Sequence, residues 1–251
     1  MNRVIGWQFA IKKVAERARL LTGILGIALL TGCATGPNAN PKDPWEPYNR
    51  DMTKFNESVD GAVLKPAATA YKTVTPAVVR TGLSNFFGNL TQLWTALNGA
   101  LQLKGEVAAV SLVRFNVNFF LGFGGVLDLA SEIHLERYRE DFGQTLGRWG
   151  VPTGPYFVLP IYGPSTLRDS LAFGVESQAD LVGQLNDGTV RGALYVLRAL
   201  ELRANLLRAG DVLDEAALDK YTFARDVFLQ RRESQVFDGL ERESKEEPVD
   251  E

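Results

Sequence analysis

The chain has 251 residues, with 27 basic and 30 acidic side chains and a formal net charge of −3. Nucleic-acid binding is not expected of an acidic chain without a basic track, because that affinity comes mainly from cations that contact phosphates. A single cysteine and a single histidine exclude a disulfide within the chain and a zinc site built from several histidines.

Residues 1–32 have the three parts of a bacterial lipoprotein signal peptide. Five basic residues lie in the first 19 positions, the 11 mostly apolar residues from Leu20 to Leu30 follow, and Thr31-Gly32 precede Cys33. The apolar run is too short to span a bilayer, which takes about 20 residues. We therefore expect cleavage before Cys33 and acylation of this cysteine. Sorting to the periplasmic face of the outer membrane is favoured, because Ala34 rather than aspartate follows the cysteine.

A single domain is expected at residues 43–237, between a tether at 33–42 and a tail at 238–251. The nine residues of the tether after Cys33 are small and polar. They reach at most about 30 Å, so the domain is expected to stay close to the membrane. The tail has seven acidic and two basic residues, a composition typical of disorder. The tail's role is open between a solubilising segment and a docking segment for a soluble partner.

Helical periodicity dominates the domain, and its first half contains three predicted helices. The first opens around Pro44 and Pro47, carries Tyr48, Met52, Phe55 and Val59 on one face, and is expected to stop at Gly61. The second opens at Thr75-Pro76 and continues past Trp94. The third runs from Lys104 to Leu121 and is unusually apolar near its end.

Two further helices are predicted in the second half of the domain. One is amphipathic and runs from Thr189 to Ala209, with Gly210 beyond its end, and the other runs from Tyr221 to Phe237. Alternation typical of a strand is confined to short stretches such as Tyr156 to Leu159. The pattern predicts an all-α fold.

Two glycine-containing regions interrupt the helical pattern. The first places Gly122, Gly124 and Gly125 among Phe119, Phe120, Phe123 and Leu127. These glycines suit either a hinge or a plain turn between helices.

The second region, residues 143–163, contains five glycines together with prolines at 152, 155 and 160. It cannot be one continuous helix, because glycine and proline both weaken the hydrogen-bond ladder. Aromatic residues such as Tyr156 are interleaved with these breakers. The stretch is therefore either a buried connection or irregular backbone that faces lipid or lines a cavity.

Catalytic patterns are poorly represented, and we expect neither an enzyme nor a cofactor or metal site. His134 is the only histidine available to a serine triad, and Gly163-Pro-Ser165-Thr-Leu167 lacks the second glycine of a nucleophile elbow. The run Gly122-Phe-Gly124-Gly125 lacks the third glycine of a dinucleotide-binding fingerprint.

Three blocks of residues together resemble the VacJ/MlaA family of outer-membrane lipoproteins. The first block comprises Asp43-Pro-Trp-Glu-Pro-Tyr-Asn-Arg50, Phe55-Asn56 and Gly82-Leu-Ser-Asn-Phe86. The second comprises Arg114-Phe115, Asn118, Gly122, Gly124-Gly125 and Asp128. The third comprises Phe142-Gly-Gln-Thr-Leu-Gly-Arg-Trp-Gly-Val151, Gly154-Pro155-Tyr156, Pro160, Gly163 and Arg168-Asp169.

The resemblance implies a ring-like helical body in the periplasmic leaflet of the outer membrane. An amphipathic channel through the ring would remove misplaced phospholipids from the outer leaflet and pass them to a soluble periplasmic carrier. Association with a trimeric porin is also implied. The candidate channel or gate residues are Phe55, Asn56, Phe119, Phe120, Gly122, Phe123, Gly124, Gly125 and Leu127. The structural motif comprises Gly154, Pro155, Tyr156, Pro160, Gly163, Arg168 and Asp169.

Two expectations concern how these residues act. Asn56 is expected to lie near the glycine-rich bend at 122–125, so that helix and bend gate the channel together. Gly154 to Pro160 is expected to be a fixed element rather than a mobile lid, because its prolines restrict φ and its aromatic residues offer packing surface. Two other functions remain open: a structural lipoprotein that tethers or stabilises a porin complex, and a lipid hydrolase.

Overall fold

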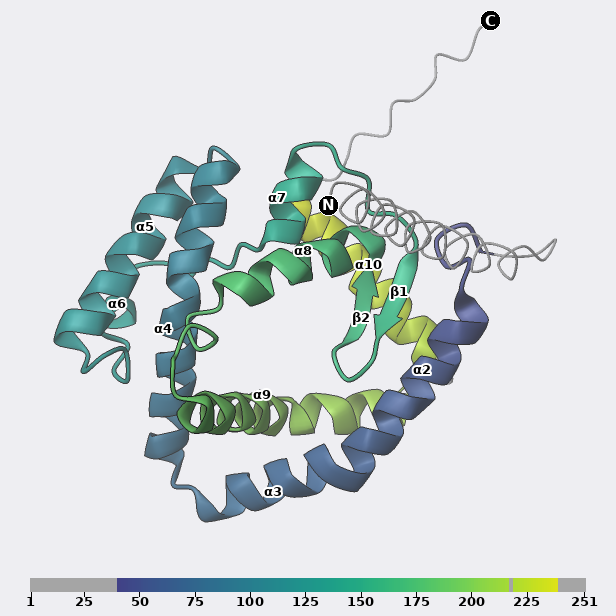
Figure 1. The fold of residues 1–251 in the computed structure, drawn as a ribbon, viewed down its shortest axis with the longest axis horizontal. Helices are drawn as coiled ribbons and strands as arrows, with labels where there is room; N and C mark the ends of the chain where they lie inside the picture. The colour runs from purple at the N-terminus through teal and green to yellow at the C-terminus, as the bar shows by residue number, and fades with distance from the viewer. Residues whose placement is uncertain (1–39, 217–218, 239–251) are drawn as a thin grey trace, which may run out of the picture.

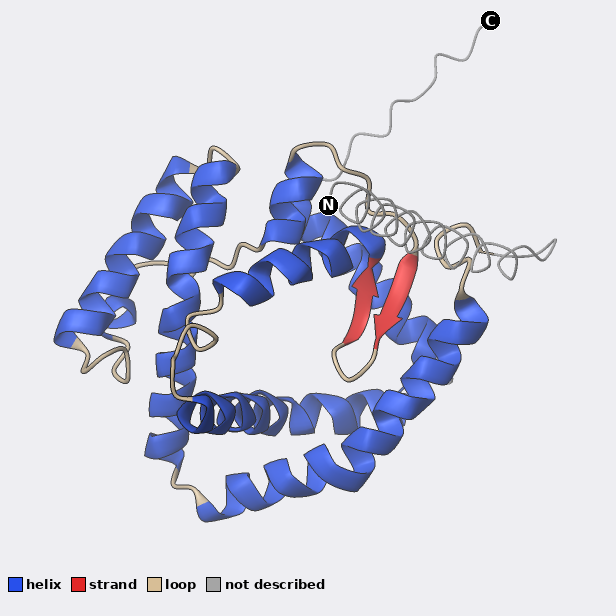
Figure 2. Ribbon diagram, viewed as in Figure 1, coloured by secondary structure: helices blue, strands red, loops and turns tan. Residues whose placement is uncertain are grey.

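The computed structural model describes residues 40–216 and 219–238. The signal peptide, Cys33, most of the tether and all but the first residue of the tail lie outside these ranges. The described part is predominantly helical (Figure 2), which confirms the all-α prediction. The two strands found among the described residues, β1 (Tyr156–Leu159) and β2 (Gly163–Thr166), form one antiparallel hairpin.

The helices follow one another around a ring (Figure 1). One side is formed by α2 (Glu46–Val59) and α3 (Lys65–Val74), and the next by α4 (Ala77–Leu101). The opposite side holds α7 (Phe142–Arg148), α8 (Leu167–Ala179) and the hairpin, whose turn points into the ring. Two long helices complete the body: α9 (Gly188–Ala216) packs on α3, and α10 (Lys220–Val236) contacts α7 and β2.

A second layer lies outside the ring, beyond α4. It contains α5 (Gly105–Asn116), a π-helical segment at Val117–Leu121, and the short α6 (Leu129–Glu132). The third predicted helix, Lys104 to Leu121, therefore corresponds to α5 and the π-helical segment together. In the described part of the chain, no helix is both long enough and apolar enough to cross a membrane.

Two predicted helix ends are wrong, because glycine weakens a helix without necessarily ending it. Gly61 lies within a π-helical turn, Asp60–Leu64, that joins α2 directly to α3. Asp60 in this turn accepts hydrogen bonds from Arg203 of α9 at 2.6 and 2.7 Å. Similarly, α9 continues through Gly210 to Ala216. A glycine inside a helix costs only about 1 kcal/mol relative to alanine, which tertiary contacts offset easily.

The layer formed by α4 and α5 has polar residues inside and apolar residues outside. The buried residues of α4 are mostly polar, and they include Asn89, Gln92, Thr95 and Asn98. By contrast, the large exposed side chains of this layer are apolar, and Phe120 and Phe123 are 72% and 81% exposed. This distribution is the reverse of a water-soluble helical hairpin, and an exposed apolar surface of this kind marks an interaction site or a membrane contact.

A small apolar core lies between the hairpin and α10. Buried Tyr156, Val158 and Tyr221 form its centre, with Met52, Phe228 and Leu229 packed against them. The ring of Tyr156 makes edge contacts with the rings of Tyr221 and Phe228. The hairpin is therefore held on α10 by packing as well as by its two-stranded ladder.

Candidate functional site

The hairpin is fastened to α2 by two asparagines that lie seven residues apart. Asn49 is fully buried, and its Nδ2 donates to the main-chain oxygen of Tyr156 at 3.1 Å while its Oδ1 accepts from the amide of Val158 at 2.9 Å. Asn56 repeats this arrangement two turns later, donating to the oxygen of Leu159 at 2.9 Å and accepting from the amide of Ile161 at 2.7 Å. Residues seven apart share one helix face, so both carboxamides address the same strand.

These contacts overturn the expected position of Asn56. The glycine-rich bend at 122–125 lies beyond α4, across the ring from α2 (Figure 1). The bend contacts α4 instead, where Asn85 donates to the main-chain oxygen of Val126 at 3.1 Å. Asn56 and Phe55 therefore belong to the hairpin side of the ring, and Phe55 is half exposed on α2. Sequence spacing gave no information on which element faces α2, since that depends on tertiary packing.

A buried ion pair joins the start of the domain to α10. Asp43 accepts from the Tyr221 hydroxyl, from Nη1 of Arg225 at 3.1 Å and from Nδ2 of Asn49 at 2.8 Å. Burial raises the pKa of Tyr221, and donation to Asp43 raises it further. Asp43 and Asn49 therefore tie the first described residues, β1 and α10 to one another.

The glycine-rich bend is a tight turn that requires glycine at 124 and 125 because of φ and at 122 because of space. A Cβ at Gly122 would overlap the main-chain oxygen of Leu127. Gly124 and Gly125 have φ values of +72° and +96°, in the left-handed region that glycine adopts without strain. A Cβ at Gly125 would lie 2.8 Å from the side chain of Asn89. Around these glycines, the predicted residues Phe119, Phe120, Phe123 and Leu127 are all exposed. The bend therefore presents apolar side chains outward from a compact backbone.

A buried charge network connects this bend to α5. Arg114 is 1% exposed, and its Nη2 donates to both oxygens of Asp128 at 2.8 and 3.0 Å. Asn118 donates to Asp128 at 2.9 Å and accepts from the amide of Ala130 at the same distance. Burial alone would raise the pKa of Asp128, but hydrogen bonds from Ser131 and Asn118 and the charge of Arg114 lower it overall. The network holds both ends of the bend against α5.

A second charge network lies beside the hairpin and involves Arg168 and Asp169 of the third sequence block. Arg232 of α10 donates through Nε to Asp169 at 2.8 Å, and through Nη1 and Nη2 to Asp141 at 2.6 and 2.9 Å. Arg168 donates to the other oxygen of Asp169 at 3.0 Å. Burial on its own would raise the pKa of Asp141, but the hydrogen bonds and charge of Arg232 lower it overall. The network joins α7, α8 and α10.

The remaining motif residues shape the two ends of the hairpin. Gly154 and Gly163 have φ values of +69° and +83° on the two sides of β1. The main-chain oxygen of Pro155 accepts from the amide of Leu167 at 3.0 Å. Tyr156 between them is 1% exposed. These contacts agree with the expectation of a packed element, and they place Pro160 at the start of the turn.

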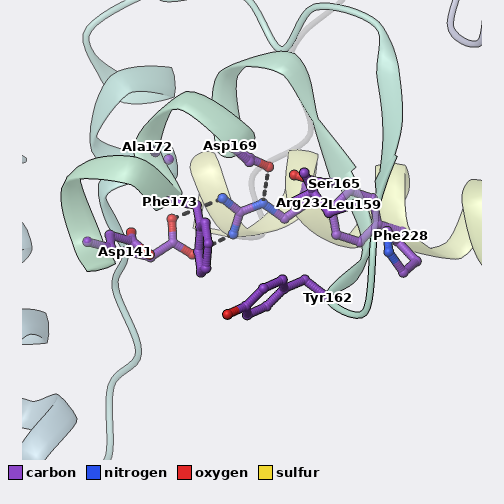
Figure 3. A pocket seen from close by; sticks show the side chains of 12 residues that line it. Asp141, Leu159, Tyr162, Ser165, Asp169, Ala172, Phe173, Phe228 and Arg232 are labelled. Carbon is purple, nitrogen blue, oxygen red and sulfur yellow. Dashed lines mark hydrogen bonds and ion pairs between the residues drawn. The ribbon is translucent and has the colours of Figure 1, made fainter. Parts of the chain in front are cut away.

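A cavity of about 250 Å³ lies between the hairpin and the second charge network (Figure 3). Its walls come from the hairpin, α7, α8 and α10, and include Leu159, Tyr162, Ser165, Phe173 and Phe228 together with charged Asp141, Asp169, Glu176 and Arg232. The rings of Tyr162 and Phe173 are 4.7 Å apart between centroids. Tyr162 is 69% exposed, and it lies at the edge of the cavity on the side of the ring interior.

Glu176 is the least compensated charge of the cavity. Its Oε1 accepts from the amide of Phe142 at 2.6 Å, and no ion pair of Glu176 occurs within the described ranges. Burial raises the pKa of this carboxyl. Neither Glu176 nor Arg232 was identified from the sequence, because a carboxylate or a guanidinium gives no local signal of what it will face.

A metal site would depend on clustered ligating side chains, and a serine triad on the single histidine. Among residues 40–216 and 219–238, no group of three or more His, Cys, Asp or Glu is placed to hold a metal ion. His134 is exposed in a turn, with φ of +61°. The candidate site is thus a set of packed surfaces and one polar cavity around a ring.

Comparison with known proteins gives one consistent family. The family model described as "MlaA lipoprotein" matches residues 41–235. The "Intermembrane phospholipid transport system lipoprotein MlaA" of Escherichia coli is 34% identical over 238 residues, covering 92% of this chain and 94% of that protein. The protein of the same name from Haemophilus influenzae is 34% identical over 237 residues, covering 90% and 94%.

A solved structure extends this similarity to three dimensions. The chain solved under the description "Structural basis for maintenance of bacterial outer membrane lipid asymmetry" matches with a TM-score of 0.68 and 33% identity. The match covers 77% of this chain and 98% of that one.

Proposed function

This chain belongs to the MlaA lipoprotein family, and on that premise we propose that it is a phospholipid-transport lipoprotein that maintains the lipid asymmetry of the outer membrane. The relatives that carry the name of the phospholipid transport system are matched over nearly their whole length. The observation that carries the proposal is a ring of helices whose outer layer is polar inside and apolar outside, as a lipid-embedded body requires.

Phospholipids misplaced in the outer leaflet would pass through an amphipathic channel in the ring. Such a path takes apolar side chains for acyl chains and a few polar groups for headgroups, as ligand sites generally do. The exposed aromatic residues of the bend, including Phe119, Phe120 and Phe123, supply apolar surface at the outer layer. The hairpin turn supplies Tyr162 and the charged cavity behind it. No covalent step is needed, so the protein acts without catalysis.

The acyl chains on Cys33 would hold the protein in the periplasmic leaflet of the outer membrane. Two or more acyl chains give stable anchoring, whereas one is marginal. A soluble periplasmic carrier would receive the lipid, and a trimeric porin would bind the apolar outer layer. The exposed side chains Leu112, Val113 and Phe120 support a contact of this kind on α5 and the segment after it.

The bend at 122–125 and the hairpin fastened by Asn56 lie on opposite sides of the ring, so they do not form one gate. The bend has positive φ values at Gly124 and Gly125, and the hairpin turn is held by two hydrogen bonds from the face of α2 that packs against it.

A deletion strain tests the function directly. We expect phospholipid to accumulate in the outer leaflet of the strain and to return to wild-type levels on complementation. The variant Cys33→Ala should remain unprocessed or mislocalised and should fail to complement. Normal surface lipid in the deletion strain would refute the transport function.

Lipid analysis of the purified protein separates the two other functions. A structural lipoprotein that only tethers a porin would carry no stoichiometric phospholipid, whereas a transporter would. Release of fatty acid or lysophospholipid from bound lipid would instead identify a hydrolase.

A further inference from the structure

The cavity behind the hairpin carries more negative than positive charge. Asp141, Asp169 and Glu176 line it, and Arg232 is the one cation among its lining residues. Arg232 pairs with Asp141 and Asp169, and Arg168 pairs with Asp169 from outside the lining. Two guanidinium groups thus face three carboxylates, and the ionised cavity has an excess of one negative charge. Opposite charges at close range favour one another most strongly where water is partly excluded. The cavity therefore favours a positively charged ligand.

Arg232 uses four of its five N–H groups within the protein, three of them on carboxylates, so it offers little to an anion. Its Nε donates to Asp169, its Nη2 donates to Asp141, and its Nη1 donates to Asp141 and to Gln235 at 3.2 Å. Glu176, by contrast, has one oxygen bonded to the Phe142 amide and no cation partner in the described part of the chain. A half-buried carboxylate without a counter-ion is costly, and a ligand cation would relieve that cost.

The remaining walls of the cavity suit an organic cation better than a metal ion. Tyr162, Phe173 and Phe228 line it, and aromatic faces attract ammonium groups through cation–π interactions. Metal coordination is not favoured, because no group of metal-ligating side chains with suitable geometry occurs among residues 40–216 and 219–238.

The size of the cavity points to a small group. About 250 Å³ is below the volume of a typical drug-sized site, about 300–1,000 Å³. A volume of this size suits a headgroup rather than two acyl chains. Tyr162 leaves the cavity accessible from the interior of the ring.

We propose that this cavity binds the ammonium group of zwitterionic phospholipid headgroups, with Glu176 as the charge partner and the rings of Tyr162 and Phe173 as the aromatic wall. The inference rests on the proposed function and gives it a substrate preference. Ethanolamine and choline headgroups carry the required charge, whereas glycerol headgroups do not. The protein would thus hold phosphatidylethanolamine more tightly than phosphatidylglycerol at this point of the path.

Calorimetric titration of the full-length purified protein in detergent tests the preference. The titrants are dihexanoyl phosphatidylethanolamine and dihexanoyl phosphatidylglycerol, with free ethanolamine as a third. We expect tighter binding of the ethanolamine lipid, and in Glu176→Gln about five- to tenfold weaker binding of that lipid alone. The glutamine keeps an oxygen for the Phe142 amide, so the fold is retained. Glu132→Gln, an exposed change on α6, is the matched control.

The outcomes separate the headgroup preference from the transport function. Equal binding of the two lipids, or a preference that Glu176→Gln leaves intact, overturns the cavity assignment while lipid transport stands. Free ethanolamine that binds as tightly as the lipid overturns a lipid headgroup as the ligand. A wild-type protein that binds neither lipid contradicts the proposed function itself. Phe173→Leu gives a second variant, which should weaken ethanolamine-lipid binding and spare the glycerol lipid.

Discussion

Replacing Asn49 with alanine tests whether buried side-chain hydrogen bonds hold the hairpin to the ring. The wild-type side chain is 0% exposed and makes three hydrogen bonds of 2.8 to 3.1 Å, to Asp43, Tyr156 and Val158. Alanine removes all three and leaves the amide of Val158 without its side-chain acceptor. No alternative acceptor is available from solvent, because Val158 is itself buried.

The expected loss of stability follows from these contacts. A net contribution of about 1 kcal/mol for each hydrogen bond gives about 3 kcal/mol. For a domain of this size, 1 kcal/mol shifts the Tm by about 2–4 °C, so the expected fall is about 6–12 °C. Thermal unfolding followed by circular dichroism in detergent measures this change. The hairpin should also become more susceptible to proteolysis, because Asn56 is then the remaining asparagine of this pair that ties it to α2.

Two comparison variants make the test specific. Asn116→Ala removes one exposed bond, from Nδ2 to the oxygen of Leu112 at 2.7 Å, and should cost less than about 1 kcal/mol. Asn49→Asp keeps an acceptor for Val158 but places a second carboxylate next to Asp43. It should therefore be more stable in acid than at neutral pH, relative to wild type. If Asn49→Ala unfolds at the same temperature as Asn116→Ala, the hairpin does not depend on this side chain and the argument is refuted.

Three further predictions concern packing, charge and backbone conformation. Tyr156→Ala should lower the free energy of unfolding in urea by about 3–5 kcal/mol, since the ring is 1% exposed; a loss under 1 kcal/mol would contradict its core position. Burial raises the pKa of Glu176 in the folded protein. The protein therefore loses stability as the pH rises from the ordinary value of 4.5 through the folded pKa, because the carboxyl then ionises in the cavity. Glu176→Gln should accordingly match wild type in Tm below pH 4.5 and exceed it at neutral pH, and a constant difference across pH would argue against the shift. Gly125→Ala should destabilise by about 1–3 kcal/mol because its φ is +96°, whereas Gly61→Ala, in a helical turn with open space around it, should not; equal effects would count against a strained bend.

The residues that hold the hairpin and the bend at 122–125 were predictable only in part. Local sequence marked the stretch from Gly154 to Gly163 as a non-helical fixed element and the glycines at 122–125 as a hinge or turn, because glycine and proline act on the backbone locally. The partners of those elements were not predictable. Asn56 was expected at the bend, yet its carboxamide bonds to Leu159 and Ile161, 103 and 105 residues away in the sequence. A helix face shows which residues point together but not toward which neighbour.

The inverted polarity of the outer layer was also beyond sequence periodicity. Periodicity predicts helices at α4 and α5, and the structure has helices there. Periodicity alone assigns apolar faces to the interior, whereas here Asn89, Gln92 and Asn98 are buried and Phe120 is exposed. Whether an apolar stripe faces protein or lipid depends on what else the chain packs against it.

The sequence by itself determined the helical class and the family, since each depends on local composition, period or motif order, and it predicts a lipoprotein signal that ends before Cys33. Only the tertiary structure decided where charges meet. Arg232 bridges Asp169 and Asp141, which lie 63 and 91 residues away along the chain, and Glu176 lines the same cavity without an ion pair among the described residues. The physical reason is that charge pairing depends on distance in space, and distances between remote segments are set by the packing of α7, α8 and α10 and not by any local pattern.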